Sequence, residues 1–132
     1  MSAPLIVALP IADRPTTHRF YGEGLGFEAI GELADDGVPE PLQFVLNDGA
    51  RLMFIPTGGF GWVTGDHETA PPGTSECLLS RNVESDAEVD EHIERARAAG
   101  AVVLAEPEPK PWGYLGLFAD PDTHLWQVIH PT

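Results

Sequence analysis

The chain has 132 residues, the length of one domain or of two small modules that share a core. It carries 21 acidic side chains against 7 Lys and Arg, a formal net charge of −14, which argues against nucleic acid as a partner. No apolar run reaches the roughly 18 residues of a membrane span, and the single cysteine excludes an internal disulfide. We therefore expect a cytoplasmic protein that binds neither nucleic acid nor membrane.

The first half of the sequence predicts the order β-α-β-β-β. Residues 4–11 are rich in Leu, Ile and Val and predict a buried strand. Asp13 precedes Arg14-Pro15, and proline is favoured at the start of a helix, so a short helix is expected over about 16–23. An Asp-Gly pair predicts a hairpin between the last two of three further strands. Those strands are expected at 27–31, 42–46 and 51–55.

Residues 57–74 predict a long loop without regular structure, because they are rich in glycine and end near Pro71-Pro72. Loops of this length are usually functional or disordered. Phe60 and Trp62 lie within it, and large aromatic side chains in such a loop need a surface to cover. That surface is either a binding cleft or a partner subunit.

The second half predicts β-α-β-β-β again. The helix opens near Asp86 and carries an apolar stripe at Val89, Ile93 and Ala96. The other expected elements are a strand over 75–80, a strand over 101–105, a proline-rich loop over 106–111, and a closing hairpin around Asp120-Pro121-Asp122. The two halves share a pattern of elements with little sequence identity.

The closing hairpin contains one polar residue in an apolar strand. Gln127 shares its strand face with Leu125 and Ile129, so its amide must find a hydrogen-bond partner or face a cavity. In the preceding strand, Tyr114 and Phe118 share a face. We interpret Gln127 either as a core amide or as a polar group in a ligand pocket.

Motifs stand at both ends of the chain: the strand ending at Asp13, the Phe20-Tyr21…Leu25-Gly26-Phe27 sequence, and a Trp-Gly strand followed by Asp-Pro-Asp. Together they resemble the vicinal oxygen chelate superfamily, which includes glyoxalase I, extradiol dioxygenases, fosfomycin-modifying enzymes and bleomycin-resistance proteins. The resemblance implies one α+β domain, residues 1–132, built from two βαβββ modules in a curved eight-stranded mixed sheet around a cleft. Module 1 covers about 1–56, the connecting loop 57–74, and module 2 about 75–132.

The resemblance also implies four positions at which family enzymes hold a divalent metal. In this sequence they fall on Ile6, Met53, Glu76 and Gln127. Only Glu76 is an ordinary ligand for hard cations, which take oxygen and imidazole donors. No pair of histidines has metal-ligand spacing. We therefore predict no metal, no cofactor and no catalytic residue.

The remaining features indicate non-catalytic binding of a bulky hydrophobic, aromatic or cationic natural product, such as an antibiotic in a self-protection role. The Pro111-Trp112-Gly113 segment resembles a drug-stacking segment of bleomycin-resistance proteins, although Trp112 could equally plug a dimer seam. Thr123 replaces the usual glycine after Asp-Pro-Asp, where positive φ is costly for threonine, so that turn is expected to be rebuilt. The expected ligand-binding residues are Phe44, Met53, Phe60, Trp62, Glu76, Trp112, Tyr114, Phe118 and Gln127.

Two other hypotheses remain open. One is a metal-dependent lyase or dioxygenase that uses Glu76 with ligands not identified in the sequence. The other is a metal-free enzyme in which Glu76 acts as a general base. In each case a homodimer is expected, because the apolar Phe60-Gly61-Trp62 segment needs cover.

Overall fold

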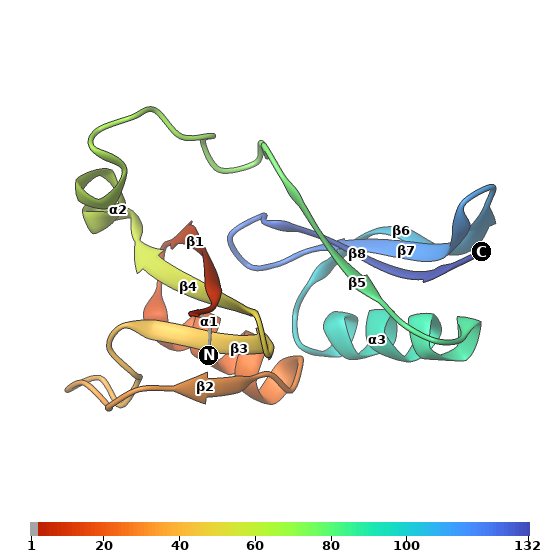
Figure 1. The fold of residues 1–132 in the computed structure, drawn as a ribbon, viewed down its shortest axis with the longest axis horizontal. Coiled ribbons are helices and arrows are strands. Elements are labelled where there is room, and N and C mark those ends of the chain that lie inside the picture. Colours follow the sequence, from red (N-terminus) through yellow and green to blue (C-terminus); the bar gives the residue numbers. More distant parts are fainter. Residues whose placement is uncertain (1–2) are drawn as a thin grey trace. The chain divides into compact units, whose positions relative to one another are not determined.

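The first module of the structure is a four-stranded mixed sheet with helices (Figure 1). The computed structural model describes residues 3–132, which divide between Thr69 and Ala70 into two units. In the sheet of module 1 the strand order is β1-β4-β3-β2, with β1 parallel to β4 and the other pairs antiparallel. Its elements are β1 (Leu5–Ile11), α1 (Arg14–Arg19), η1 (Phe20–Gly24), β2 (Glu28–Ile30), β3 (Leu42–Asn47), β4 (Ala50–Pro56) and α2 (Thr57–Thr64).

Module 1 buries an aromatic cluster between its sheet and its first helical segment. Asp13 begins α1 by accepting a hydrogen bond from the Thr16 backbone N–H at 3.0 Å. The continuation into η1, a π-helical turn, brings Tyr21 onto the sheet. Its ring centroid lies 4.6 Å from that of Phe54 and 5.8 Å from that of Phe44. All three aromatic side chains are buried, so this cluster is the core of the module.

Module 2 repeats the same topology with a longer helix. Its strand order is β5-β8-β7-β6, with β5 parallel to β8. In Figure 1 the helix α3 runs along one face of this sheet, and it contacts β6, β7 and β8. The elements are β5 (Leu78–Asn82), α3 (Asp86–Ala98), β6 (Val102–Lys110), β7 (Gly113–Ala119) and β8 (Leu125–Pro131).

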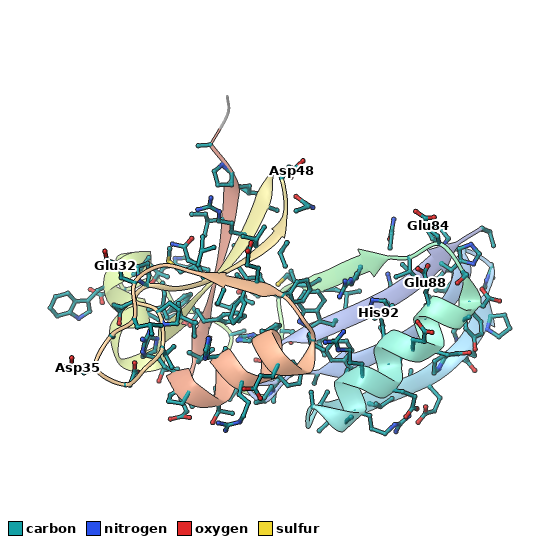
Figure 2. The ribbon with its side chains drawn as sticks, turned by 90° about the horizontal axis from the view of Figure 1, so that it is seen from below. Glu32, Asp35, Asp48, Glu84, Glu88 and His92 are labelled. Atoms are coloured by element: carbon teal, nitrogen blue, oxygen red, sulfur yellow. The ribbon has the colours of Figure 1, made fainter. Side chains whose placement is uncertain are left out.

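The helix α3 begins with a capping arrangement. The Ser85 side chain accepts from the backbone N–H of Glu88 at 3.1 Å, and the Glu88 carboxylate accepts from the backbone N–H of Glu84 at 2.6 Å. Figure 2 labels Glu84, Glu88 and His92 along this end of the helix. The predicted apolar stripe is confirmed, because its three members are buried without exposed surface. They are Val89, Ile93 and Ala96.

The α+β prediction with two βαβββ modules is confirmed, and each module has its own four-stranded sheet. Three local predictions were wrong. Residues 57–64 form α2 where a loop was expected, β5 begins at Leu78 and not at residue 75, and β6 continues to Lys110 through the expected proline-rich loop. Strand β6 is an edge strand, where prolines are tolerated because one side of the strand has no hydrogen-bonding neighbour. No helix among the described residues is long and apolar enough to cross a membrane.

The turn between β7 and β8 retains its hydrogen bonds although Thr123 replaces the usual glycine. This is contrary to the expectation that the turn would be rebuilt. Asp120 is 3 % exposed, and its Oδ1 accepts from the backbone N–H groups of Asp122 and His124, both at 2.9 Å. Thr123 adopts a φ of 68°, in the left-handed region. Its hydroxyl oxygen accepts a hydrogen bond from the Gly73 N–H at 2.9 Å, which ties the segment before β5 to this turn.

Candidate functional site

Each sheet has one face covered by a helix and one face that we call its open face. In module 2 the covered face is identified by contacts with α3. The Tyr114 hydroxyl donates to Asp90 on α3 at 2.7 Å, and a Cβ on Gly116 would lie 2.8 Å from the side chain of Ile93. Because side chains alternate along a strand, Leu115 and Leu117 lie on the open face.

The register of β7 and β8 determines where Gln127 lies. Gln127 pairs with Leu117, so it lies on the open face. On β5, β7 and β8 of module 2 the open face comprises Leu78, Ser80, Asn82, Leu115, Leu117, Ala119, Leu125, Gln127 and Ile129, and on the edge strand β6 it includes Val102, Ala105 and Glu108. Its apolar members surround three neutral polar side chains, two of them on β5.

Gln127 is held by a neighbouring hydroxyl on this face. Its Nε2 donates a hydrogen bond to Ser80 Oγ at 2.8 Å, and the two residues are partners in the parallel β5–β8 pair. The Ser80 hydroxyl can then donate its own proton, while Gln127 Oε1 can accept. The pair therefore offers one donor and one acceptor, without charge, between aliphatic neighbours.

The open face of module 1 is assigned in the same way. Phe44 and Leu52 face the aromatic core, so Gln43 and Met53, which pair with each other, face the opposite direction. This face comprises Ile6, Ala8 and Pro10 of β1, Glu28 and Ile30 of β2, Gln43 and Val45 of β3, and Arg51, Met53 and Ile55 of β4. The Oε1 atom of Gln43 is buried and has no hydrogen-bond partner.

Three expected ligand-binding residues lie on the helix-covered faces, two of them in the cores. Phe44 is fully buried beneath η1 in module 1. Phe118 is 2 % exposed and its ring stacks on Trp126 at 6.0 Å, on the face that packs against α3. Tyr114 is tied to α3 through Asp90, and this hydrogen bond raises the pKa of Tyr114 above its ordinary value. Tyr114 and Phe118 thus lie on the face opposite Gln127, because the hairpin register pairs Gln127 with Leu117.

The other expected aromatic residues are placed on the surface or at element ends. Phe60 and Trp62 lie on α2, where Phe60 is 8 % exposed and Trp62 is 89 % exposed. Trp112 lies in the turn between β6 and β7 and is 57 % exposed. Only Trp62 and Trp112 therefore present large exposed rings, which keeps both available for stacking on a ligand or a partner.

The four positions at which the family holds a metal do not fit a metal ion in this chain. Ile6 and Met53 lie on the open face of module 1 and offer no hard donor atom. Glu76 is exposed in a bend before β5, outside the sheet. The amide of Gln127 is engaged with Ser80. Across residues 3–132 no group of three or more His, Cys, Asp and Glu side chains is arranged to hold a metal.

Sequence reasoning missed Ser80 and Gln43 as polar residues of the open faces. Ser80 was placed at the end of its strand, and its pairing with Gln127 follows from a start of β5 at Leu78. Gln43 had the same signal as Gln127, an amide inside an otherwise apolar strand. A search for every such amide would have found Gln43 as well as Gln127.

Comparison with known proteins identifies the family. Residues 5–128 match the family model described as Glyoxalase/Bleomycin resistance protein/Dioxygenase superfamily. Comparison with curated proteins finds no match. Among solved structures, a glyoxalase-related enzyme from Fulvimarina pelagi is 30% identical, with 98% of this chain and 87% of that chain covered and a TM-score of 0.80.

Two further solved structures share the fold at lower identity. The hypothetical protein SA1046 from S. aureus is 22% identical, with 98% of this chain and 94% of that chain covered and a TM-score of 0.79. TnmS3, described as an antibiotic binding protein from Streptomyces sp. CB03234, is 23% identical, with 100% and 98% covered and a TM-score of 0.69. Because the family model spans nearly the whole sequence, this chain belongs to the glyoxalase, bleomycin resistance protein and dioxygenase superfamily.

Proposed function

We propose that this protein binds a hydrophobic or aromatic small molecule without transforming it, and that the ligand is an antibiotic or a similar natural product. The open face of module 2 carries the observation behind this proposal. At the position where metal-dependent relatives hold a carboxylate, Gln127 forms a neutral pair with Ser80. A neutral donor and acceptor set among aliphatic side chains suits an uncharged polar group on an apolar ligand.

Aromatic stacking is the second part of the proposal. Trp112 and Trp62 are exposed, and a stacked aromatic pair contributes about 0.5–1.5 kcal/mol beyond the area that it buries. Among the similar structures, TnmS3 is described as an antibiotic binding protein, which supports this ligand class for a chain of the same fold.

Tryptophan fluorescence and ligand recovery test the proposal together. A panel of aromatic antibiotics that includes bleomycin and anthraquinones should contain a compound that quenches the fluorescence and is recovered unchanged after incubation. Ser80→Ala and Gln127→Leu should each weaken that binding about tenfold, because an unpaired polar group on the ligand loses its partner. Ser75→Ala, the same change at an exposed serine outside the sheet, is the matched control and should have no effect.

A metal-dependent enzyme is the alternative, and the relative at 30% identity that is described as a glyoxalase-related enzyme favours it. Under our proposal, purified protein contains no stoichiometric divalent metal, and a chelator leaves the melting temperature unchanged. One Zn, Mn, Ni or Fe per chain, or conversion of the antibiotic to a product, would replace our proposal with the enzyme hypothesis. Glu76 is exposed outside the sheet, which gives no support to a role as general base.

We also propose a homodimer in solution. The helix α2 exposes Trp62 and its neighbour Val63, which is 62 % exposed, and such adjacent apolar side chains are commonly covered by a second subunit. Light scattering at micromolar concentration should give twice the monomer mass. Trp62→Ser should shift the equilibrium toward monomer, and a wild-type monomer would contradict the proposal.

A further inference from the structure

Gln43 has an unusual environment in the middle of module 1. It lies in β3, the second strand from the edge, and pairs with Ile30 of β2 and Met53 of β4. Its sequence neighbour Phe44 faces the aromatic core, so the Gln43 side chain lies on the open face. Both of its cross-strand neighbours are apolar, so nothing in the pairing requires an amide at this position.

The carbonyl oxygen of Gln43 is buried and unsatisfied. Among the described residues, only Gln43 Oε1 and Arg14 Nη1 are buried side-chain atoms without a hydrogen bond, and Arg14 Nη1 lies 3.3 Å from a Glu40 carboxylate oxygen. Buried polar atoms are almost always paired, because an unpaired one has lost water without gaining a partner. Gln127 on the open face of module 2 shows the ordinary outcome, since its amide is bonded to Ser80.

We propose that Gln43 Oε1 is a hydrogen-bond acceptor for a ligand bound on the open face of module 1, and that this ligand therefore carries an N–H or O–H donor on an aromatic body. This inference rests on the proposed binding function and narrows its ligand class to aromatic amines, amides and phenols. An acceptor without a partner loses no existing hydrogen bond when the ligand arrives. A donor that leaves water on entering this face regains its hydrogen bond there, while Met53 and Ile30 contact the apolar part of the ligand.

The proposal also states which ligands bind poorly. An ether, an ester or a tertiary amine would bring only acceptor atoms to Gln43 Oε1, and both groups would then be buried without a partner. Sites built to bond a donor reject analogues that lack it more strongly than apolar sites reject analogues of a different size. The discrimination between donor and non-donor ligands is therefore the property to measure.

Two neutral fluorescent probes that differ by one hydrogen-bond donor test this. N-phenyl-1-naphthylamine has a single N–H, and its N-methylated derivative has none. The wild-type protein should bind the N–H probe about tenfold more tightly. Gln43→Met, which keeps the side-chain length, should bind the two probes within about twofold of each other, because comparing both probes in both proteins isolates the hydrogen bond from the size of the methyl group.

Two further measurements complete the test. Gln43→Met should keep or raise the melting temperature of the free protein, because it removes an unpaired buried acceptor. Gln127→Met, the same change at the other glutamine, should retain the preference for the N–H probe. If that variant loses the preference while Gln43→Met keeps it, the acceptor is Gln127 and the inference is wrong.

The remaining outcomes separate the inference from the proposed function. Equal binding of both probes to the wild-type protein would overturn the role of Gln43 and leave small-molecule binding intact. No fluorescence change with either probe up to its solubility limit would contradict the binding function and the inference with it. An unfolded Gln43→Met protein would show that the amide is required by the fold, which also overturns the inference.

Discussion

Module 1 packs its sheet against an aromatic cluster, whereas module 2 packs its sheet against the 13-residue helix α3. In module 1 the rings of Tyr21, Phe44 and Phe54 fill the core beneath a short helix and a π-helical turn. In module 2 the aliphatic side chain of Ile93 approaches Gly116, where a side chain would leave no space. The same strand order is thus stabilised by two different kinds of packing.

The open faces differ as much as the cores. Module 1 presents Gln43 with an unpaired oxygen beside Met53, and module 2 presents Gln127 paired with Ser80. In module 2 a neighbouring hydroxyl holds the amide, whereas in module 1 no side chain bonds the amide oxygen.

The largest effect is expected in the core of module 2. Trp126 is 4 % exposed and stacks on Phe118 with an interplanar angle of 3°, so Trp126→Ala should cost about 3–5 kcal/mol of unfolding free energy. Thermal unfolding followed by circular dichroism measures it. Trp112→Ala, at a residue that is 57 % exposed, is the matched control and should shift the melting temperature by only a few degrees. A larger loss at Trp112 than at Trp126 would place Trp112 in a core and remove it from the proposed site.

Close packing of α3 on its sheet gives the second prediction. A Cβ at Gly116 would lie 2.8 Å from Ile93, so Gly116→Ala should destabilise the protein by about 1–3 kcal/mol. In module 1 the corresponding contact is loose, because a Cβ at Gly22 would lie 3.7 Å from Phe44. Gly22→Ala should therefore be neutral or stabilise by up to about 1 kcal/mol. Denaturant unfolding of both variants checks the contrast, and Ile93→Val should partly restore Gly116→Ala.

The hairpin turns provide the third prediction. The β3–β4 turn of module 1 contains Gly49, whereas the β7–β8 turn of module 2 places Thr123 at a φ of 68°. Thr123→Ala keeps the strained backbone and loses the hydrogen bond from Gly73, so it should cost about 1 kcal/mol. Thr123→Gly loses the same bond and relieves the strain, so it should be more stable than Thr123→Ala by a similar amount. Equal stability of the two variants would mean that the backbone at this turn is not strained.

Sequence patterns were sufficient for the βαβββ order of each module, because the apolar stripe of α3 and the Asp-Pro-Asp turn have local physical causes. The predictions were wrong for two segments whose structure depends on contacts with the rest of the fold. The prolines of β6 suggested a loop, but an edge strand tolerates them. The glycines of residues 57–64 suggested a loop, yet this segment is helical and contacts β1 and β4.

Site prediction was limited by strand register. The alternation along β7 and β8 was correct within each strand, but the sequence did not show which face of β7 lies beside Gln127. A shift of one residue in such a pairing moves every side chain to the other face. For this reason Tyr114 and Phe118 were expected in the same ligand-binding set as Gln127, while the structure places Leu117 beside Gln127.

The smallest predicted effects on stability are those of pH, and they differ between the two modules. In module 1 the hydrogen bonds from Thr16 lower the pKa of Asp13 from its ordinary value of 3.8, and the hydrogen bond from Arg14 lowers the pKa of Asp36. A lowered pKa means that stability is present above the unfolded-state value and is lost as the pH falls through the folded-state value. Module 1 should therefore lose stability in acid, as the pH falls through these folded-state values below the ordinary value of 3.8.

Module 2 should show the opposite dependence at alkaline pH. The hydrogen bond to Asp90 raises the pKa of Tyr114 from its ordinary value of 10.0, so its contribution is complete below that value and is lost as the pH rises through the folded-state pKa. Amide signals of α3 in NMR spectra should shift with this titration, while those of α1 should shift with the acid titration. Tyr114→Phe should abolish the alkaline change in α3 and leave the acid change in α1 intact. If the alkaline change in the signals of α3 persists in Tyr114→Phe, it arises from another titrating group, and this contrast between the two modules is lost.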